Sequence, residues 1–303
     1  MKKLILLFMN IYCVLGHDGI TICKTTQSLK ECVKNRRNNI ILLTKGIHYT
    51  YNLPIPSDTI FIIPKDTIIK VPKDAKLNPK AYGGVANSVI SSKGTPEKYL
   101  ENITIILNGI IDGNKEIHTY KKGGLEGIDW AYVRNSTITG TGKIVNANGD
   151  GLDIDASEFN SISNITTELN GGSGVHLGSP RPISSSKLNI FVNVKSNNNG
   201  YDFDKNGFDV SWPNPLGAIF INTYANKNNR NYQLKGRNSK VLYSYSKDSK
   251  NKDDFSDADE AIINNKNVTN KNILSSKLKI LLKRDFKKIL GLETPKYLEN
   301  VNY

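Results

Sequence analysis

The chain has 303 residues, enough to bury a substantial core in one large domain or two. Its formal net charge of +13 favours anionic partners, such as an acidic polysaccharide or an anionic cell surface. The basic residues are scattered rather than interleaved with stacking aromatic residues, which argues against nucleic acid as the partner.

Residues 1–16 have the order of a secretory signal peptide, in which two lysines precede an apolar run that ends in Val14-Leu15-Gly16. The apolar run is shorter than a comfortable membrane span, and no later segment approaches that length. A retained membrane anchor is the alternative. We expect cleavage after Gly16 and a secreted mature chain without a transmembrane segment. Loss of Lys2 and Lys3 would lower the net charge from +13 to +11.

Two cysteines remain after the predicted cleavage. An even pair in an exported chain indicates a disulfide between Cys23 and Cys32, with two free buried thiols as the alternative. The segment "TTQSLKECVKN" that contains Cys32 is typical of a short helix. The bridge would therefore attach a helical cap to the start of the fold.

The middle of the chain repeats with a period in the twenties. Five short segments recur at steps of 24, 23, 33 and 24 residues: "IDW" at 128, "LDI" at 152, "VHL" at 175, "FDV" at 208 and "YQL" at 232. Each is followed by a second strand-like run, and turns rich in Gly, Asn and Ser lie between them. Short alternating β-runs at a fixed period indicate an all-β solenoid, with a β-sandwich as the alternative.

The composition changes after Ser246. The charged segment "KDSKNKDDFSDADE" reads as a linker or exposed loop, so we expect a β-domain over 17–246 and a tail over 247–303. An amphipathic helix is predicted in the tail, with this apolar face: Leu274, Leu278, Leu281, Leu282, Phe286, Ile289 and Leu290. The rest of its surface is basic, with Lys277, Lys279, Lys283, Arg284, Lys287 and Lys288. This helix would either cap the solenoid or bind an anionic membrane or cell wall.

The central residues of the five repeats should form a ladder on one outer face. In chain order they are Asp129, Asp153, His176, Asp209 and Gln233, and Asp155 is a second outward position. Equivalent positions on successive coils stack about 4.8 Å apart. Carboxylates this close repel one another, unless one holds a proton or a cation, an arginine or a cationic histidine lies beside them. A solvated polar face is the alternative.

The coil of His176 is flanked by two enlarged loops, "GSPRPISSS" and "NNNGYDFDKNG". A solenoid that lengthens its loops at one level usually forms a cleft there. Five residues of these loops could reach Asp153 and His176: Arg181, Tyr201, Asp202, Asp204 and Lys205.

These repeats resemble the right-handed parallel β-helix of the pectate-lyase-like superfamily, over roughly residues 40–246. The upstream segments "NIILLTKGIHYTY" and "NGIIDGN" are similar to earlier coils of that fold. The segment "NGDGLD" resembles the polygalacturonase segment that carries the first catalytic aspartate, and Asp150 matches it. Where that family has paired aspartates and Gly-His-Gly, this chain has "NGGSG" and "GVHLG". The segment "NGYDFDKNGFD" loosely resembles the Tyr-Gly-Phe-Asp motif of alginate epimerases.

The resemblance implies a carbohydrate-active protein, because this fold carries lyases, hydrolases, epimerases and adhesins. We expect action on an acidic, uronate-containing polysaccharide by β-elimination or C5 epimerisation. His176 or Tyr201 would transfer protons, Arg181 would pair with the uronate carboxylate and Asp153 would orient His176. Asp209 completes the predicted catalytic set, and the substrate-binding candidates are Asp129, Asp155, Lys205 and Gln233.

Calcium is the expected cofactor candidate at the aspartate ladder, because hard carboxylate oxygens suit it. Two other functions stay open. The chain could be a non-catalytic β-helix that binds a glycan or a cell surface, or a polygalacturonase-like glycoside hydrolase.

Overall fold

The computed structural model describes residues 19–78, 87–119, 124–178, 186–202, 205–210, 218–234, 239–253 and 260–263. The predicted signal peptide and the predicted C-terminal helix lie outside these residues, so both stay predictions. Among the described residues, no helix has the length and apolar character needed to cross a bilayer.

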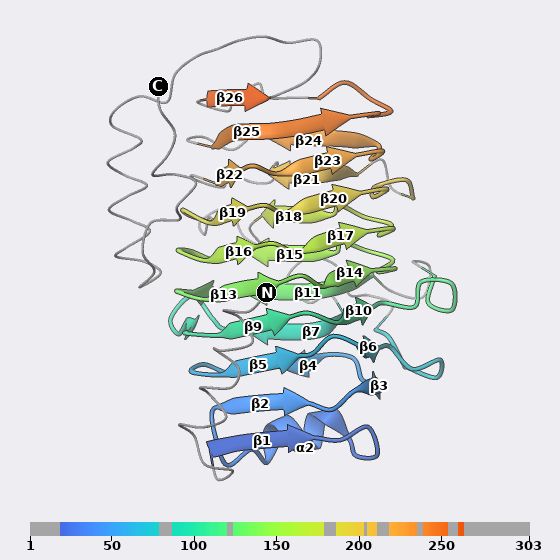
Figure 1. Cartoon of the computed structure of the whole chain (residues 1–303), viewed down its shortest axis with the longest axis vertical. Coiled ribbons are helices and arrows are strands. Elements are labelled where there is room, and N and C mark those ends of the chain that lie inside the picture. Colours follow the sequence, from blue (N-terminus) through green and yellow to red (C-terminus); the bar gives the residue numbers. More distant parts are fainter. Residues whose placement is uncertain are drawn as a thin grey trace.

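The chain winds into a stack of coils, and each coil from β2 to β24 contributes one strand to each of three parallel ladders (Figure 1). Sheet A contains β1 (Ile20–Cys23), β2 (Ile40–Leu43), β5 (Ile60–Ile63), β9 (Thr104–Leu107), β13 (Thr137–Gly140), β16 (Ser161–Ser163), β19 (Ile190–Val192), β22 (Ile219–Ile221), β25 (Lys240–Lys247) and β26 (Glu260–Ile263). Sheet B contains β3 (Gly46–Tyr49), β6 (Thr67–Lys70), β10 (Ile110–Asp112), β14 (Lys143–Val145), β17 (Thr166–Glu168), β20 (Lys195–Asn197), β23 (Tyr224–Asn226) and the end of β25.

Sheet C carries the predicted aspartate ladder. It contains β4 (Leu53–Pro54), β7 (Asn87–Lys93), β11 (Leu125–Ala131), β15 (Leu152–Asp155), β18 (Val175–Gly178), β21 (Asn206–Val210) and β24 (Arg230–Leu234). A two-stranded pair of β8 (Leu100–Glu101) and β12 (Val133–Arg134) lies beside the stack. Every pairing is parallel, so the predicted solenoid is confirmed and the sandwich alternative is wrong.

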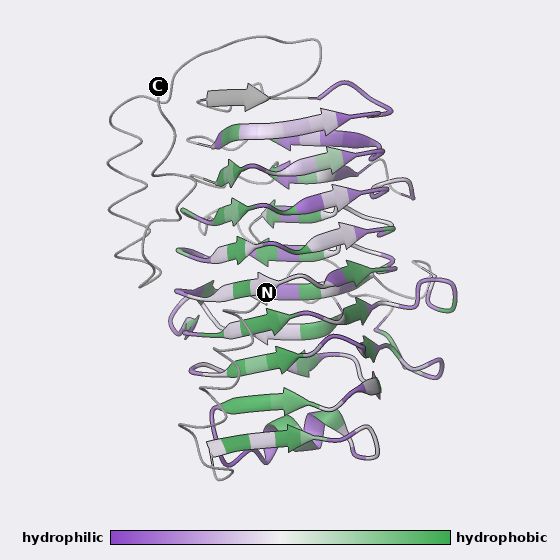
Figure 2. Ribbon diagram, viewed as in Figure 1, coloured by the Kyte–Doolittle hydropathy of each residue, from purple (hydrophilic) through white to green (hydrophobic). Residues whose placement is uncertain are grey.

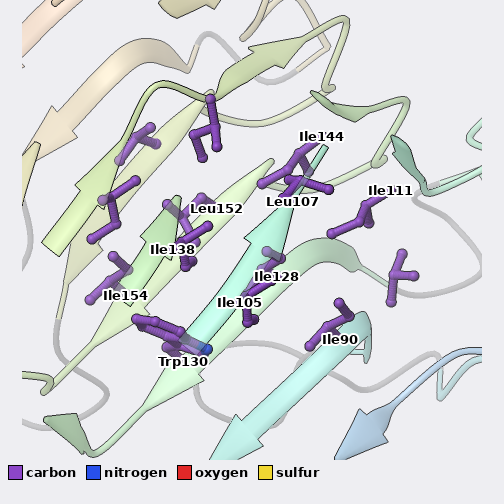
Figure 3. Close-up of a cluster of buried hydrophobic side chains, with 14 of the residues drawn as sticks. Ile90, Ile105, Leu107, Ile111, Ile128, Trp130, Ile138, Ile144, Leu152 and Ile154 are labelled. Atoms are coloured by element: carbon purple, nitrogen blue, oxygen red, sulfur yellow. The ribbon is translucent and has the colours of Figure 1, made fainter. Parts of the chain in front are cut away.

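Aliphatic ladders fill the interior of the coils. Ile138 of β13 lies between Ile105 and Ile162 in register, and all three side chains are fully buried. Figure 3 shows side chains of the three sheets, such as Ile105, Ile144 and Leu152, meeting inside the stack. Because side chains alternate along each strand, the same alternation that fills this core sends the ladder residues to the outside.

Buried asparagines close the turn between sheets B and C. The Oδ1 atom of Asn170 accepts a hydrogen bond from the main-chain N–H of Ala147 at 3.0 Å, and Asn199 and Asn228 repeat the arrangement on the next coils at 3.0 and 2.9 Å. A turn leaves main-chain donors that no ladder satisfies, and an unpaired buried donor is costly. These amides fix the turns that lead into β18 (Val175–Gly178), β21 (Asn206–Val210) and β24 (Arg230–Leu234) of sheet C.

The first helix lies beside β1 at the end of the stack (Figure 1). It is α2 (Leu29–Lys34), with Ser28 as its N-cap and with Leu29 and Val33 buried in the core. Cys23 and Cys32 form the predicted disulfide between β1 and this helix. The helix occupies the predicted segment, and its function as a cap stays a prediction.

Sheet A continues past the expected domain boundary at residue 246. β25 ends at Lys247, and β26 pairs with it from within the segment that was expected to be a linker. The strand is only four residues long and directly follows an acidic run, which is why its sequence resembled a loop.

Candidate functional site

The predicted ladder exists on the outer face of sheet C. Asp129 pairs in register with Asp153, Asp153 with His176, His176 with Asp209, and Asp209 with Gln233. The residues on either side of each ladder position, such as Leu152 and Ile154, point into the core. The three acids of the ladder and Asp155, the second outward position, are buried. None of the four is more than 7% exposed: Asp129, Asp153, Asp155 and Asp209. The solvated polar face considered from the sequence is therefore wrong.

His176 is the centre of the charged cluster. Its Nδ1 atom lies 2.8 Å from Oδ1 of Asp153 and 3.7 Å from Oδ2 of Asp150. Burial alone would lower the pKa of His176, but the hydrogen bond to Asp153 and the charges of Asp153, Asp150 and Asp209 outweigh it and raise the pKa well above 6.5. The acids around the imidazole therefore favour its doubly protonated, cationic form.

Asp150 is positioned by the turn that precedes β15. One of its carboxylate oxygens accepts the main-chain N–H of Ser173, and its own N–H donates to the carboxylate of Glu126. Burial and the charge of Asp153 raise the pKa of Asp150 to about 6, against the opposing charges of His176 and Lys205. A side chain at Gly172 would collide with the Asp150 carboxylate, which accounts for a glycine in "NGGSG".

Three further acids surround this centre. Burial, together with the charge of Asp153, raises the pKa of Asp129 to about 7, although Lys93 lies 2.6 Å from its Oδ2 atom and lowers it. Burial and the charge of Asp153 also raise the pKa of Asp155 well above its usual value. Burial and the neighbouring Asp150 raise the pKa of Glu126. These carboxyl groups therefore keep their protons to a higher pH than exposed carboxyl groups do.

The far end of the ladder is a hydrogen-bonded polar group. Asn206 donates to Oδ2 of Asp209 at 2.8 Å and to Oε1 of Gln233 at 3.0 Å. Arg230 donates to the same Gln233 oxygen at 2.6 Å, and Ser173 Oγ donates to Asp209 at 3.3 Å. Ser173 thus connects Asp150 with Asp209, because its main-chain N–H donates to Asp150 and its hydroxyl donates to Asp209.

The loop residues predicted at the site have different positions. The hydroxyl of Tyr201 donates to the carbonyl of Lys227 at 2.6 Å rather than to a residue of the ladder, and the side chain is exposed. Asp202 forms an ion pair with Lys115 at 3.6 Å. Lys205 is close enough to lower the pKa of Asp150. Arg181 and Asp204 lie outside the described residues, as does most of the first enlarged loop, so the cleft over His176 stays a prediction.

Glu126 and Lys93 were missed from the sequence. Lys93 ends β7, the coil before the first repeat that was aligned, and Glu126 lies three residues before Asp129, outside the repeated triplets. The sequence signal for each was a charged residue in a strand of otherwise mostly apolar or small residues. Such a residue can be assigned to the site only when the register of the neighbouring coils is known.

Three groups of the cluster could share a metal ion, since ligand atoms of Asp150, Asp153 and His176 all lie within 4.8 Å of one another. Calcium, however, takes six to eight oxygen ligands. This set offers two carboxylates and an imidazole nitrogen, and that nitrogen already contacts one of the carboxylates. These three ligands therefore fit calcium poorly, and calcium as a cofactor stays a hypothesis.

No protein-family model matches the sequence, and no curated protein sequence is similar to it. The fold is similar to that of ORF18 of Geobacillus virus E2, with 13% identity and a TM-score of 0.56 over 74% of this chain, which spans only 48% of ORF18. The family 28 exopolygalacturonase of Yersinia enterocolitica is similar at 10% identity and a TM-score of 0.49, with coverage of 82% and 64% of the two chains. PfbA, a surface adhesin of Streptococcus pneumoniae, is similar at 11% identity and a TM-score of 0.47, with coverage of 75% and 59%. The chain has the fold of the right-handed parallel β-helix proteins.

Proposed function

We propose that this chain is an exported carbohydrate-active protein that acts on an acidic, uronate-containing polysaccharide by β-elimination or C5 epimerisation. The observation that carries the proposal is the contact of His176 with Asp153 and Asp150 on adjacent coils. This contact puts His176, which can donate a proton, beside Asp150, which can accept one. The side chains of His176 and Asp150 are partly exposed, whereas the acids of the ladder are almost inaccessible.

The roles follow from the pKa values. Asp150, with a pKa of about 6, is ionised at neutral pH and can remove the C5 proton. In β-elimination the C5–H electrons then form the C4–C5 double bond, and the C4–O bond to the leaving sugar breaks. His176, whose pKa is raised well above 6.5, can donate its proton to the leaving oxygen. In epimerisation the same donor would return a proton to the opposite face of C5. This assigns His176 the role of acid rather than base.

Asp153 would orient His176, because it holds the Nδ1 atom and leaves Nε2 for the substrate. A uronate carboxylate also needs a cation. Lys205 is exposed and electrostatically close to Asp150, so it is the described candidate, while Lys93 is paired with Asp129 and Arg230 with Gln233. Arg181 stays a proposal for the same task.

The proposal is tested by incubating the secreted protein with a panel of uronate polymers. A lyase releases unsaturated ends that absorb in the ultraviolet, and an epimerase incorporates solvent deuterium at C5. His176→Gln and Asp150→Asn should each lower the rate about 100- to 10,000-fold, the usual contribution of an acid or base. Glu168→Gln, which removes an acid paired with Lys143 on sheet B, is the matched control and should keep full activity. Unchanged rates in the two site variants would contradict the assignment.

Glycoside hydrolysis is the second candidate, and it is favoured by the raised pKa of Asp129, about 7, on the coil before that of the ionisable Asp150. A protonated carboxyl group is the usual acid of glycosidases. New reducing ends without ultraviolet absorption or deuterium would establish it. Binding of one polymer without any product would instead establish a non-catalytic glycan-binding protein. Activity that EDTA abolishes and calcium restores would support the calcium hypothesis in spite of the donor set.

A further inference from the structure

The outer face of sheet A carries apolar side chains that are buried although they point away from the core. In β19 and β22 the central residues Phe191 and Phe220 point inward and belong to the interior cluster. Their neighbours in sequence therefore point outward and stack in two columns, Ile190 with Ile219 and Val192 with Ile221. On the next strand Leu242 continues the second column, and Lys240 follows Ile219 in the first. We call this set the outer patch: Ile190, Val192, Ile219, Ile221 and Leu242. None belongs to the interior cluster, and none is more than 6% exposed.

Position on this face does not by itself bury a side chain. The same two columns continue to the first coils of sheet A, where exposure is mixed: Ile22 is 44% and Ile60 is 37% exposed, whereas Ile62 is 7% exposed. Figure 2 shows that strands at both ends of sheet A are apolar, β2 and β5 as well as β19 and β22. The main contacts of β19 and β22 among the described elements are with their neighbours within the sheet, β16 and β25. The uniform burial of the outer patch therefore points to a cover from outside the described elements over the last coils.

The C-terminal tail supplies a cover of the right chemistry. Its predicted helix over 274–290 carries seven large apolar residues on one face and six basic residues on the rest. The described chain ends at Ile263 in β26, which pairs with β25 in the same sheet as the patch. Residues 264–273 reach about 35 Å when extended. A 17-residue helix is about 25 Å long, which exceeds the roughly 14 Å that three coils span.

We propose that segment 274–290 packs its apolar face on the outer patch of sheet A. It would cover the side of the stack rather than its end, in contrast with the cap expected from the sequence. A membrane or cell wall is then not the partner of the apolar face, because that face is already occupied. The basic residues would stay exposed and add positive charge beside the last coils.

Cysteine labelling of the full secreted chain tests the proposal. Ile221→Cys should react slowly with a maleimide in the full chain and about tenfold faster or more when the chain ends at residue 263. Ile22→Cys, at an exposed position of the same column, should react rapidly in both chains and controls for the reactivity of the maleimide. Ile138→Cys, fully buried in the core, should react slowly in both chains and controls for general unfolding. Slow labelling of the cysteine at 221 in the shortened chain would overturn the proposal, because another segment would then cover the patch.

Point variants avoid dependence on a truncated protein. In the full chain, Leu281→Asp and Phe286→Asp should accelerate labelling of the cysteine at 221, and the matched changes Lys283→Asp and Lys287→Asp should not. A double variant, Ile219→Cys with Leu281→Cys, should form a disulfide within one chain on oxidation. Cross-linking only between two chains would overturn the proposal in favour of a second copy. Binding to phosphatidylserine vesicles that Leu281→Asp abolishes, without any change in labelling, would overturn it in favour of a membrane.

Discussion

The Nδ1 atom of His176 lies 2.8 Å from Oδ1 of Asp153, on two strands that are paired in register. The spacing of successive coils sets this contact, and no loop is needed to make it. A parallel β-helix therefore provides an ordered acid–histidine pair wherever the two residue types follow each other at the repeat distance. Asp150, fixed by Ser173 of the next coil, extends the pair to a third group.

The first prediction concerns stability and His176. Its pKa is raised in the folded protein, so the folded state binds the proton more tightly than the unfolded chain does. The resulting stabilisation is fully present below the unfolded pKa of about 6.5 and is lost as the pH rises through the higher folded pKa. The free energy of unfolding of His176→Gln should therefore lie below that of the native protein near pH 6, and the difference should shrink at alkaline pH. A difference that grows with pH would contradict the raised pKa.

The second prediction concerns Asp155, whose pKa is raised by burial and by Asp153. Its contribution to stability is present below its unfolded pKa of about 3.9 and is lost as the pH rises through the folded pKa. Asp155→Asn should therefore stabilise the protein at pH 8, by about 0.5–2 kcal/mol, the common gain from relieving one unfavourable group. Urea denaturation at pH 4 and pH 8 measures it, and the gain should be smaller at pH 4. Glu168→Gln, on sheet B, is expected to show no such gain.

The ladder could be predicted because it depends only on alternation and period. "LDI", "VHL" and "FDV" have the same pattern of one polar residue between two apolar ones, and parallel stacking then determines which residues are neighbours. The burial of the acids could not be predicted in this way. It depends on how the surrounding chain covers sheet C, and a repeat in the sequence does not contain that information.

The loop residues show the limit of the same reasoning. Tyr201 was placed near His176 because its loop is long, but its hydroxyl binds the carbonyl of Lys227 on the next turn. Loop length gives reach without direction. Conversely, Glu126 was missed because it acts across the turn, where its carboxylate binds the N–H of Asp150. Contacts of this kind follow from turn geometry rather than from a repeated pattern.

The third prediction concerns the core. Ile138→Ala should lower the free energy of unfolding by about 2–5 kcal/mol, because the side chain is fully buried between Ile105 and Ile162 and leaves a cavity. Thr137→Ala, at the preceding and outward position of β13, is the control and should change it by less than about 0.5 kcal/mol. Urea denaturation with circular dichroism compares the two. Equal losses would mean that the alternation of β13 is not as described.

The fourth prediction concerns the disulfide. Cys23 and Cys32 are nine residues apart, and a loop of that size constrains the unfolded chain by about 2.5 kcal/mol in the chain-entropy model. Reduction should therefore increase hydrogen exchange in β1 and α2 more than in the central coils, such as β13 to β18. Thiol titration of the native protein should find no free thiol at Cys23 or Cys32, and two free thiols would refute the bridge.

The fifth prediction concerns the pH dependence of turnover. If Asp150 is the base, kcat/KM on the uronate polymer should rise as the pH increases through about 6, where this carboxyl group loses its proton. It should fall again at alkaline pH, as His176 loses the proton that it donates. Asp150→Asn removes the group responsible for the acidic limb, so its residual activity should no longer rise through pH 6, whereas Glu168→Gln should retain the full bell shape. An acidic limb that persists in Asp150→Asn would assign the base to another group, and Asp129, with a pKa of about 7, would then be the next residue to replace.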